Sequence, residues 1–179
     1  MTNIQHSSKS NEWYTPTFII ELVHEVIGYP DLDPASSHHA NQVVKAHDYL
    51  TKEDNALNCL WSRYPVSVFL NPPGGKIKNK SQSLLFWEKL IQLRDSGNLR
   101  EAIFLAFSIE QLAISQKCSK SLCDFTLVIP EKRIKFVNPS KEKHSPTHSN
   151  VIVYVPGTSD NTEKFVTVFK TLGRALKPY

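Results

Sequence analysis

The chain has 179 residues, of which 40% are hydrophobic and 21% charged, and this composition predicts one globular domain with a substantial core. Its apolar runs are far shorter than the roughly 18 residues of a membrane span, its polar start lacks the apolar stretch of a signal peptide, and its three cysteines form no disulfide-dense pattern. We therefore expect an intracellular, cytoplasmic protein with free thiols. The net charge of +4 favours a polyanionic partner without requiring one.

The N-terminal part of the chain is expected to be a disordered arm followed by a helix. Residues 1–10 are polar and are left outside the fold, so the expected domain spans residues 11–179. Apolar residues then recur at helical spacing and predict a helix over residues 16–27. Thr15 is a plausible N-cap of this helix, with Pro16 at the first helical position.

Two predicted strands end in turns forced by proline. Residues 31–36 form a short strand that turns at Asp33-Pro34, and the apolar residues 66–70 form a buried strand that ends in Asn71-Pro72-Pro73-Gly74-Gly75. Open α/β sheets bind ligands at the carboxyl ends of their strands, and a carboxamide both donates and accepts hydrogen bonds. Asn71 therefore marks a candidate site, although an ordinary tight turn is the alternative. Residues 37–60 show no clear pattern.

The rest of the chain continues to alternate between strands and helices. We expect helices over residues 83–93, 109–117 and 163–176, strands over 101–107, 125–130 and 151–155, and an extended piece over 133–137. This alternation predicts a three-layer α/β domain with a mostly parallel central sheet and helices on both faces.

Four motifs occur in order along the chain. They are Asn11-Glu12-Trp13-Tyr14-Thr15-Pro16, Leu32-Asp33-Pro34-Ala35-Ser36, Asn71-Pro72-Pro73 and Arg133-Ile134-Lys135-Phe136. Together they make the chain resemble the phage-type Dam-like DNA N6-adenine methyltransferases over about residues 11–156. The resemblance implies a compact Rossmann-like methyltransferase fold, S-adenosylmethionine as cofactor, and methyl transfer to N6 of adenine in DNA, in a bacterial or phage-infected cell.

The resemblance assigns catalysis to the turn formed by Asn71, Pro72, Pro73 and Gly74. The Asn71 side-chain oxygen and the Pro72 carbonyl would accept hydrogen bonds from the two N–H groups of the adenine amine, which localises the nitrogen lone pair. The target base must leave the duplex, and relatives commonly carry an aromatic residue at the position of Gly74 to stack on it. Either the activity is weaker here, or another aromatic serves: Tyr14, Trp87 or Phe136.

The same resemblance assigns cofactor binding to Trp13, Tyr14, Thr15, Pro16, Asp33, Pro34, Ala35, Ser36 and Asp54. The Thr15 hydroxyl and the helix N-terminus would meet the methionine carboxylate. Asp33 would accept either from the ribose hydroxyls or from the methionine ammonium, a choice left open because the usual glycine-rich turn is absent. Asp54 could bond the cofactor's adenine. Contacts with DNA are expected from Lys76, Lys78, Lys80, Arg133, Lys135 and Phe136.

Other functions and sites remain in view at this point. N4-cytosine methylation is the nearest alternative, because the same turn serves any exocyclic amine, and a DNA- or cofactor-binding module that has lost catalysis is the next. Cys118, Cys123, His144 and His148 superficially suggest zinc, but the gap between the pairs is longer than usual finger spacing. His38 and His39 are adjacent, and neighbouring side chains in an extended chain point apart, so joint ligation of a metal is improbable. The DNA recognition sequence and the oligomeric state cannot be read from the sequence.

Overall fold

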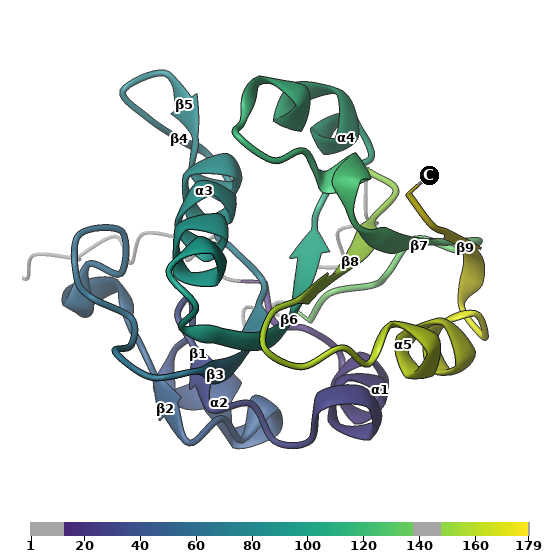
Figure 1. Cartoon of the computed structure of the whole chain (residues 1–179), viewed down its shortest axis with the longest axis horizontal. Helices are drawn as coiled ribbons and strands as arrows, with labels where there is room; N and C mark the ends of the chain where they lie inside the picture. Colours follow the sequence, from purple (N-terminus) through teal and green to yellow (C-terminus); the bar gives the residue numbers. More distant parts are fainter. Residues whose placement is uncertain (1–12, 138–147, 179) are drawn as a thin grey trace, which may run out of the picture.

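A seven-stranded sheet runs through the middle of the computed structural model, which describes residues 13–137 and 148–178 (Figure 1). Its strands lie side by side in the order β2-β1-β3-β6-β8-β7-β9. In chain order they are β1 (Leu32–Asp33), β2 (Asp48–Tyr49), β3 (Val66–Leu70), β6 (Leu99–Ala106), β7 (Thr126–Pro130), β8 (Val151–Pro156) and β9 (Gly173–Leu176).

The sheet is mostly parallel, as predicted. Strands β2, β1, β3 and β6 pair in parallel, β8 lies antiparallel between β6 and β7, and β9 pairs antiparallel with β7. Strand β7 therefore runs in the same direction as the first four strands. Parallel strands in this arrangement carry their carboxyl ends to one common edge of the sheet.

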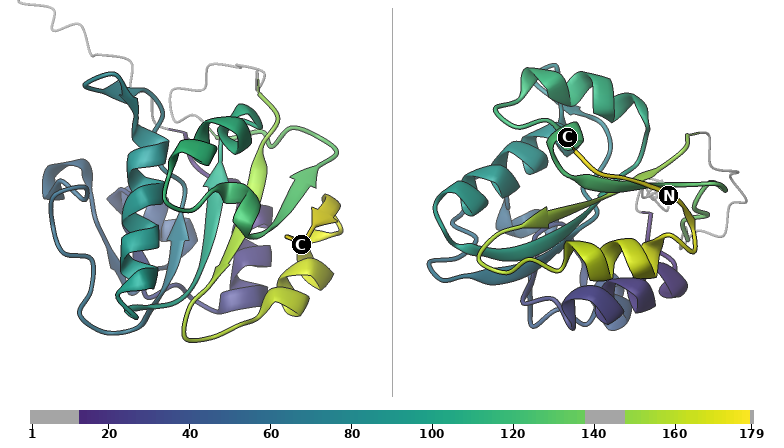
Figure 2. Two further views of the ribbon diagram at one scale, coloured as in Figure 1. Left: turned by 45° about the horizontal axis from the view of Figure 1, so that its top comes forward. Right: turned by 45° about the vertical axis from the view of Figure 1, so that its right-hand side comes forward.

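Helices cover both faces of the sheet (Figures 1 and 2). Helices α1 (Thr17–Ile27) and α5 (Thr162–Phe169) pack on one face, and α2 (His38–Val44) contacts α1. The other face carries α3 (Gln82–Asp95), while α4 (Glu110–Ile114) is followed by short 3-10 turns at η2 (Ser115–Lys117) and η3 (Leu122–Asp124). Successive strand residues point to opposite faces, so Phe69 and Ile103 join the α1 and α5 core, whereas Val68 and Phe104 join the α3 core. None of the described helices is long and apolar enough to cross a bilayer.

The C-terminal helix ends earlier than predicted. It stops at Phe169, and Gly173–Leu176 forms the edge strand β9. The reason is close packing against β7, because a Cβ atom at Gly173 would lie only 2.1 Å from the Ile129 carbonyl oxygen. Glycine is required for this approach, and the apolar spacing that continues to Leu176 is typical of a helix only up to the point where β7 offers a ladder partner.

Three further local expectations need correction or completion. Helix α1 begins at Thr17 with Pro16 in the N-cap position, so the prediction that Thr15 caps it was wrong. The stretch 133–137 is no strand but contributes one isolated bridge, between Tyr14 and Val137. The unclear residues 37–60 contain α2, β2 and the turn η1 (Lys52–Asp54). A hairpin of β4 (Lys76–Ile77) and β5 (Lys80–Ser81) was not predicted.

Candidate active site

The direction of the chain changes between β1 and β3. From β1 the chain moves outward to β2, and then returns to add β3 on the opposite side of β1. Such a reversal opens a crevice at the carboxyl ends of the two strands, where open α/β sheets bind ligands. Leu32 pairs with Val68, so Asp33 lies level with Phe69, two residues before Asn71. The two strand exits singled out in the sequence therefore meet at one place.

Asn71 is held in one orientation by the segment that precedes α1. Its Nδ2 donates a hydrogen bond of 3.1 Å to the Thr15 hydroxyl and lies 3.5 Å from the Trp13 carbonyl oxygen. A backbone carbonyl can only accept, so the nitrogen of the carboxamide is the atom that faces this segment. Among the described residues, nothing donates to the Asn71 oxygen, which points away from these two partners.

The segment around Thr15 is itself fixed by a distant part of the chain. The Tyr14 N–H donates to the Val137 carbonyl at 2.9 Å, and the Val137 N–H donates back to the Tyr14 carbonyl at 2.9 Å. Thr15 is buried with 8% exposure. The first, third and fourth sequence motifs are thus joined through backbone and side-chain hydrogen bonds.

Asp33 is a buried carboxyl group at the end of β1, with 3% exposure. The Ala35 N–H donates to its Oδ1 at 3.2 Å. Burial raises the pKa of Asp33 to about 6, against the opposing effect of hydrogen bonds from the Ser36 side chain and the Ala35 backbone. No ion pair joins Asp33 to a lysine, arginine or histidine in the part of the chain that the structure describes. A buried carboxyl without a cation favours a ligand that carries a positive charge or hydroxyl donors.

The turn after β3 becomes exposed within a few residues. Pro72 is buried, whereas Pro73 and Gly74 are exposed. A Cβ atom at Gly74 would meet no heavy atom within 4 Å, so the position is open for a side chain although the sequence has none there.

Of the three aromatic residues considered as a stacking partner for the base, one is excluded. Trp87 is fully buried on α3, and its indole N–H donates to the Lys120 carbonyl at 2.8 Å. Phe136 is half-buried and packs against the α1 and α5 core. Tyr14 is half-buried directly beside Thr15, with its ring centroid 5.0 Å from that of His39.

The family model described as DNA N-6-adenine-methyltransferase (Dam) matches residues 2–169. The chain belongs to this family. It is therefore an adenine-specific DNA methyltransferase that depends on S-adenosylmethionine, and the cytosine-specific and non-catalytic alternatives find no support. No curated protein and no solved structure matches the chain significantly.

The basic residues of the methyltransferase lie on two exposed segments. Lys76, Lys78 and Lys80 are exposed on the β4–β5 hairpin, which follows directly from the Asn71 turn. Arg133 and Lys135 are exposed on the stretch that leads to Val137, and the bridge from Val137 to Tyr14 brings this stretch to the segment that holds Asn71. Both basic segments thus connect directly to the candidate site.

Three other positions of the methyltransferase have local partners. Asp54 accepts from the Thr51 N–H and hydroxyl, both at 2.7 Å, and these bonds lower its pKa and close the turn η1. His38 and His39 lie on α2 rather than on an extended chain, against Tyr49 and Tyr14 respectively. His144 lies outside the described residues, and within those described no group of three potential metal ligands gathers.

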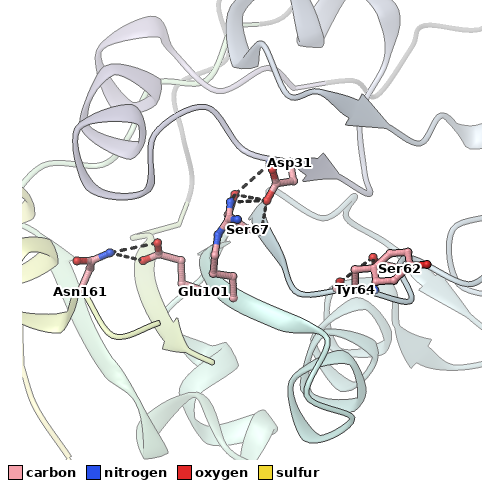
Figure 3. A network of polar contacts seen from close by, with 7 residues as sticks. Asp31, Ser62, Tyr64, Ser67, Glu101 and Asn161 are labelled. Atoms are coloured by element: carbon pink, nitrogen blue, oxygen red, sulfur yellow. Dashed lines mark hydrogen bonds and ion pairs between the residues drawn. The ribbon is translucent and has the colours of Figure 1, made fainter. Parts of the chain in front are cut away.

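The opposite edge of the sheet carries a separate polar network that sequence reasoning missed. Asp31 accepts from the Ser67 N–H and from Arg100, each at 2.6 Å, and Glu101 accepts from Asn161 and from the Tyr154 hydroxyl (Figure 3). These residues lie at the beginning of β1, β3 and β6, away from the strand exits. Their hydrogen bonds are satisfied within the protein, so the network holds the strands together rather than binding a ligand.

Proposed function

We propose that Asn71 and Pro72 bind the amine of an adenine flipped out of DNA, in a Rossmann-like methyltransferase domain whose crevice lies between β1 and β3. The observation that carries this proposal is the bond from Asn71 Nδ2 to Thr15. Because the nitrogen is occupied, the Asn71 oxygen is left to accept from an incoming N–H group. The reversal of strand order beside this residue supports the same location.

The chemistry requires acceptors rather than a strong base. The lone pair of the adenine amine is delocalised into the ring, so the nitrogen is a poor nucleophile. Two acceptors, the Asn71 oxygen and the Pro72 carbonyl, would favour a pyramidal nitrogen and stabilise the positive charge that develops on it. Among the described residues, no backbone N–H donates to the Pro72 carbonyl. Pro72 and Pro73 fix the turn, so both acceptors are held in place before the base arrives.

The residues around Asp33 suit the cofactor. S-adenosylmethionine supplies a methyl group on a positively charged sulfur, together with an ammonium group and ribose hydroxyls. Asp33 is a buried carboxyl group with no cationic partner among the described residues, and it lies on the strand next to Asn71. We assign it to an ammonium or hydroxyl group of the cofactor, and the turn of Pro34, Ala35 and Ser36 to its surroundings.

The segment before α1 has two roles in this proposal. Trp13, Tyr14 and Pro16 remain candidates for cofactor contact. Thr15 faces Asn71, so we assign its hydroxyl to the orientation of the catalytic carboxamide rather than to the cofactor carboxylate. Asp54 is the weakest of the cofactor candidates, because both of its hydrogen bonds close its own turn.

DNA would be held by the two exposed basic segments. Lys76, Lys78 and Lys80 on the hairpin, with Arg133 and Lys135 near Val137, are suited to phosphate groups on either side of the Asn71 turn. Phe136 is packed against the core on one side, so we assign it to the support of this segment. Each lost phosphate contact should reduce the dependence of binding on salt by about one unit of slope.

The decisive experiment is a methylation assay with labelled S-adenosylmethionine and unmethylated DNA of mixed sequence, followed by nucleoside analysis. The label is expected on N6 of adenine. Asn71→Ala removes one charge-stabilising acceptor and is expected to lower kcat by about 10²- to 10³-fold. Asn58→Ala removes an exposed asparagine whose partner is Asn55, and serves as the matched control. A folded Asn71→Ala variant that transfers methyl as fast as the parent would contradict the proposal.

A further inference from the structure

The β4–β5 hairpin is a built element that the expected roles of its lysines do not explain. Lys76 pairs with Ser81 and Ile77 pairs with Lys80, around a two-residue turn of Lys78 and Asn79. Both turn residues have positive φ, 46° and 67°, which gives the turn the twist that suits a tight hairpin.

The base of the hairpin is tied to the turn that follows Asn71. The Gln82 N–H donates to the Gly75 carbonyl at 3.0 Å, and the Gln82 side chain donates to the Gly74 carbonyl at 3.0 Å. The hairpin projects beyond the start of α3, on the side of the molecule toward which β6 points (Figures 1 and 2). A short ribbon is therefore fixed beside the carboxyl ends of the strands.

The hairpin exposes an apolar side chain among its charges. Ile77 is 41% exposed, although it lies in a two-residue strand flanked by lysines. Ile77 faces the same side of the ribbon as its partner Lys80, so one face combines an apolar group with a cation. Phosphate binding needs only the lysines, and exposure of isoleucine to water brings no benefit. The combination suits a surface that meets both the backbone and the bases of a nucleic acid.

We propose that the hairpin enters the DNA duplex and that Ile77 occupies the space left in the base stack when the target adenine flips out. This inference rests on the proposed function of Asn71. Isoleucine is among the apolar residues that proteins insert between base steps, and a two-stranded ribbon fits the major groove. The wedge lowers the cost of flipping from inside the duplex. It thereby compensates for Gly74, which offers the flipped base no aromatic surface.

The test compares two substrates, unmethylated duplex DNA and the same DNA heat-denatured, with labelled S-adenosylmethionine. Ile77→Ala is expected to lower kcat/KM on duplex DNA by about tenfold and to leave kcat/KM on denatured DNA within about twofold of the parent, because single strands have no stack to fill. Leu176→Ala is the matched control, since Leu176 is similarly exposed at 44% on β9, the far edge of the sheet. It should leave both rates unchanged.

A second variant decides the case in which denatured DNA is no substrate for the parent. A side chain at Gly74 meets open space, so Gly74→Phe can restore the stacking surface without a clash. Added to Ile77→Ala, it should recover at least about fivefold of the lost activity on duplex DNA. The wedge is refuted if Ile77→Ala matches the parent on duplex DNA, if both substrates lose activity equally, or if Gly74→Phe recovers nothing. If the parent itself methylates no adenine, the proposed function fails instead.

Discussion

The bond between Thr15 and Asn71 gives the sharpest test of the site. Thr15→Val keeps the shape of the side chain but removes the hydroxyl that accepts from Asn71 Nδ2 at 3.1 Å. The remaining contact of Asn71, with the Trp13 carbonyl, is longer at 3.5 Å. The carboxamide then loses the partner that directs its oxygen toward the substrate.

The expected loss follows from the strength of one hydrogen bond. A net contribution of about 0.5–1.5 kcal/mol, expressed fully in the transition state, corresponds to a kcat lowered by about 2- to 13-fold. This is well below the effect expected for Asn71→Ala, because Thr15→Val leaves the acceptor oxygen in the protein and only loosens its orientation.

The assay separates this role from the one that the family resemblance assigned. If Thr15 orients Asn71, then Thr15→Val lowers kcat at saturating cofactor and leaves the Kd for S-adenosylmethionine unchanged, and Thr15→Ser restores most of kcat. Thr17→Val, at an exposed threonine two residues away, should behave as the parent. A raised Kd for S-adenosylmethionine with an unchanged kcat would refute the orientation of Asn71 by Thr15 and return the hydroxyl to the cofactor.

Two further predictions concern the aspartates of β1. The pKa of Asp33 is raised from 3.8 to about 6, so this group favours the folded state fully below pH 3.8 and loses that contribution as the pH rises through 6; Asp33→Asn should therefore raise the free energy of unfolding at pH 8, by at most roughly 3 kcal/mol, with a difference that shrinks toward acid in thermal unfolding. The same variant should weaken S-adenosylmethionine binding at pH 8 in calorimetry, and the parent should lose affinity as the pH falls below about 6. Asp31→Asn breaks the bonds to Ser67 and Arg100 and should lower stability by about 1–3 kcal/mol, with kcat unchanged at a temperature where the variant stays folded.

The elements predicted best are those whose signal is local. Strand β3 has the predicted bounds, because its apolar run is continuous and two prolines end it at once. Helix α1 ends at Ile27 as predicted, but its beginning was misjudged. A threonine before a proline is typical of an N-cap, and nothing in the local pattern shows that the Thr15 hydroxyl is used by Asn71, which lies 56 positions along the chain.

The elements missed depend on contacts that a local pattern does not contain. Residues 173–176 continue an apolar helical spacing, yet their place in the edge strand is set by β7 and by the close approach at Gly173. The hairpin carried one usable signal, Asn79, since asparagine tolerates the positive φ of a tight turn. Lys78 in the other turn position, instead of a glycine or asparagine, weakened that signal.

Asp31 and Asp33 show why the site needed the structure as well as the motifs. They stand two residues apart around one short strand, and both precede or begin a turn that a carboxylate could serve. Asp31 reaches back to Arg100 and to the backbone of β3, so its charge is balanced within the protein. Asp33 lies at the exit of β1, buried and without an ion pair among the described residues, beside the strand that carries Asn71. A carboxylate that the protein leaves unbalanced at a strand exit is stabilised only when a ligand arrives, and that difference makes Asp33 rather than Asp31 the residue to test for cofactor binding.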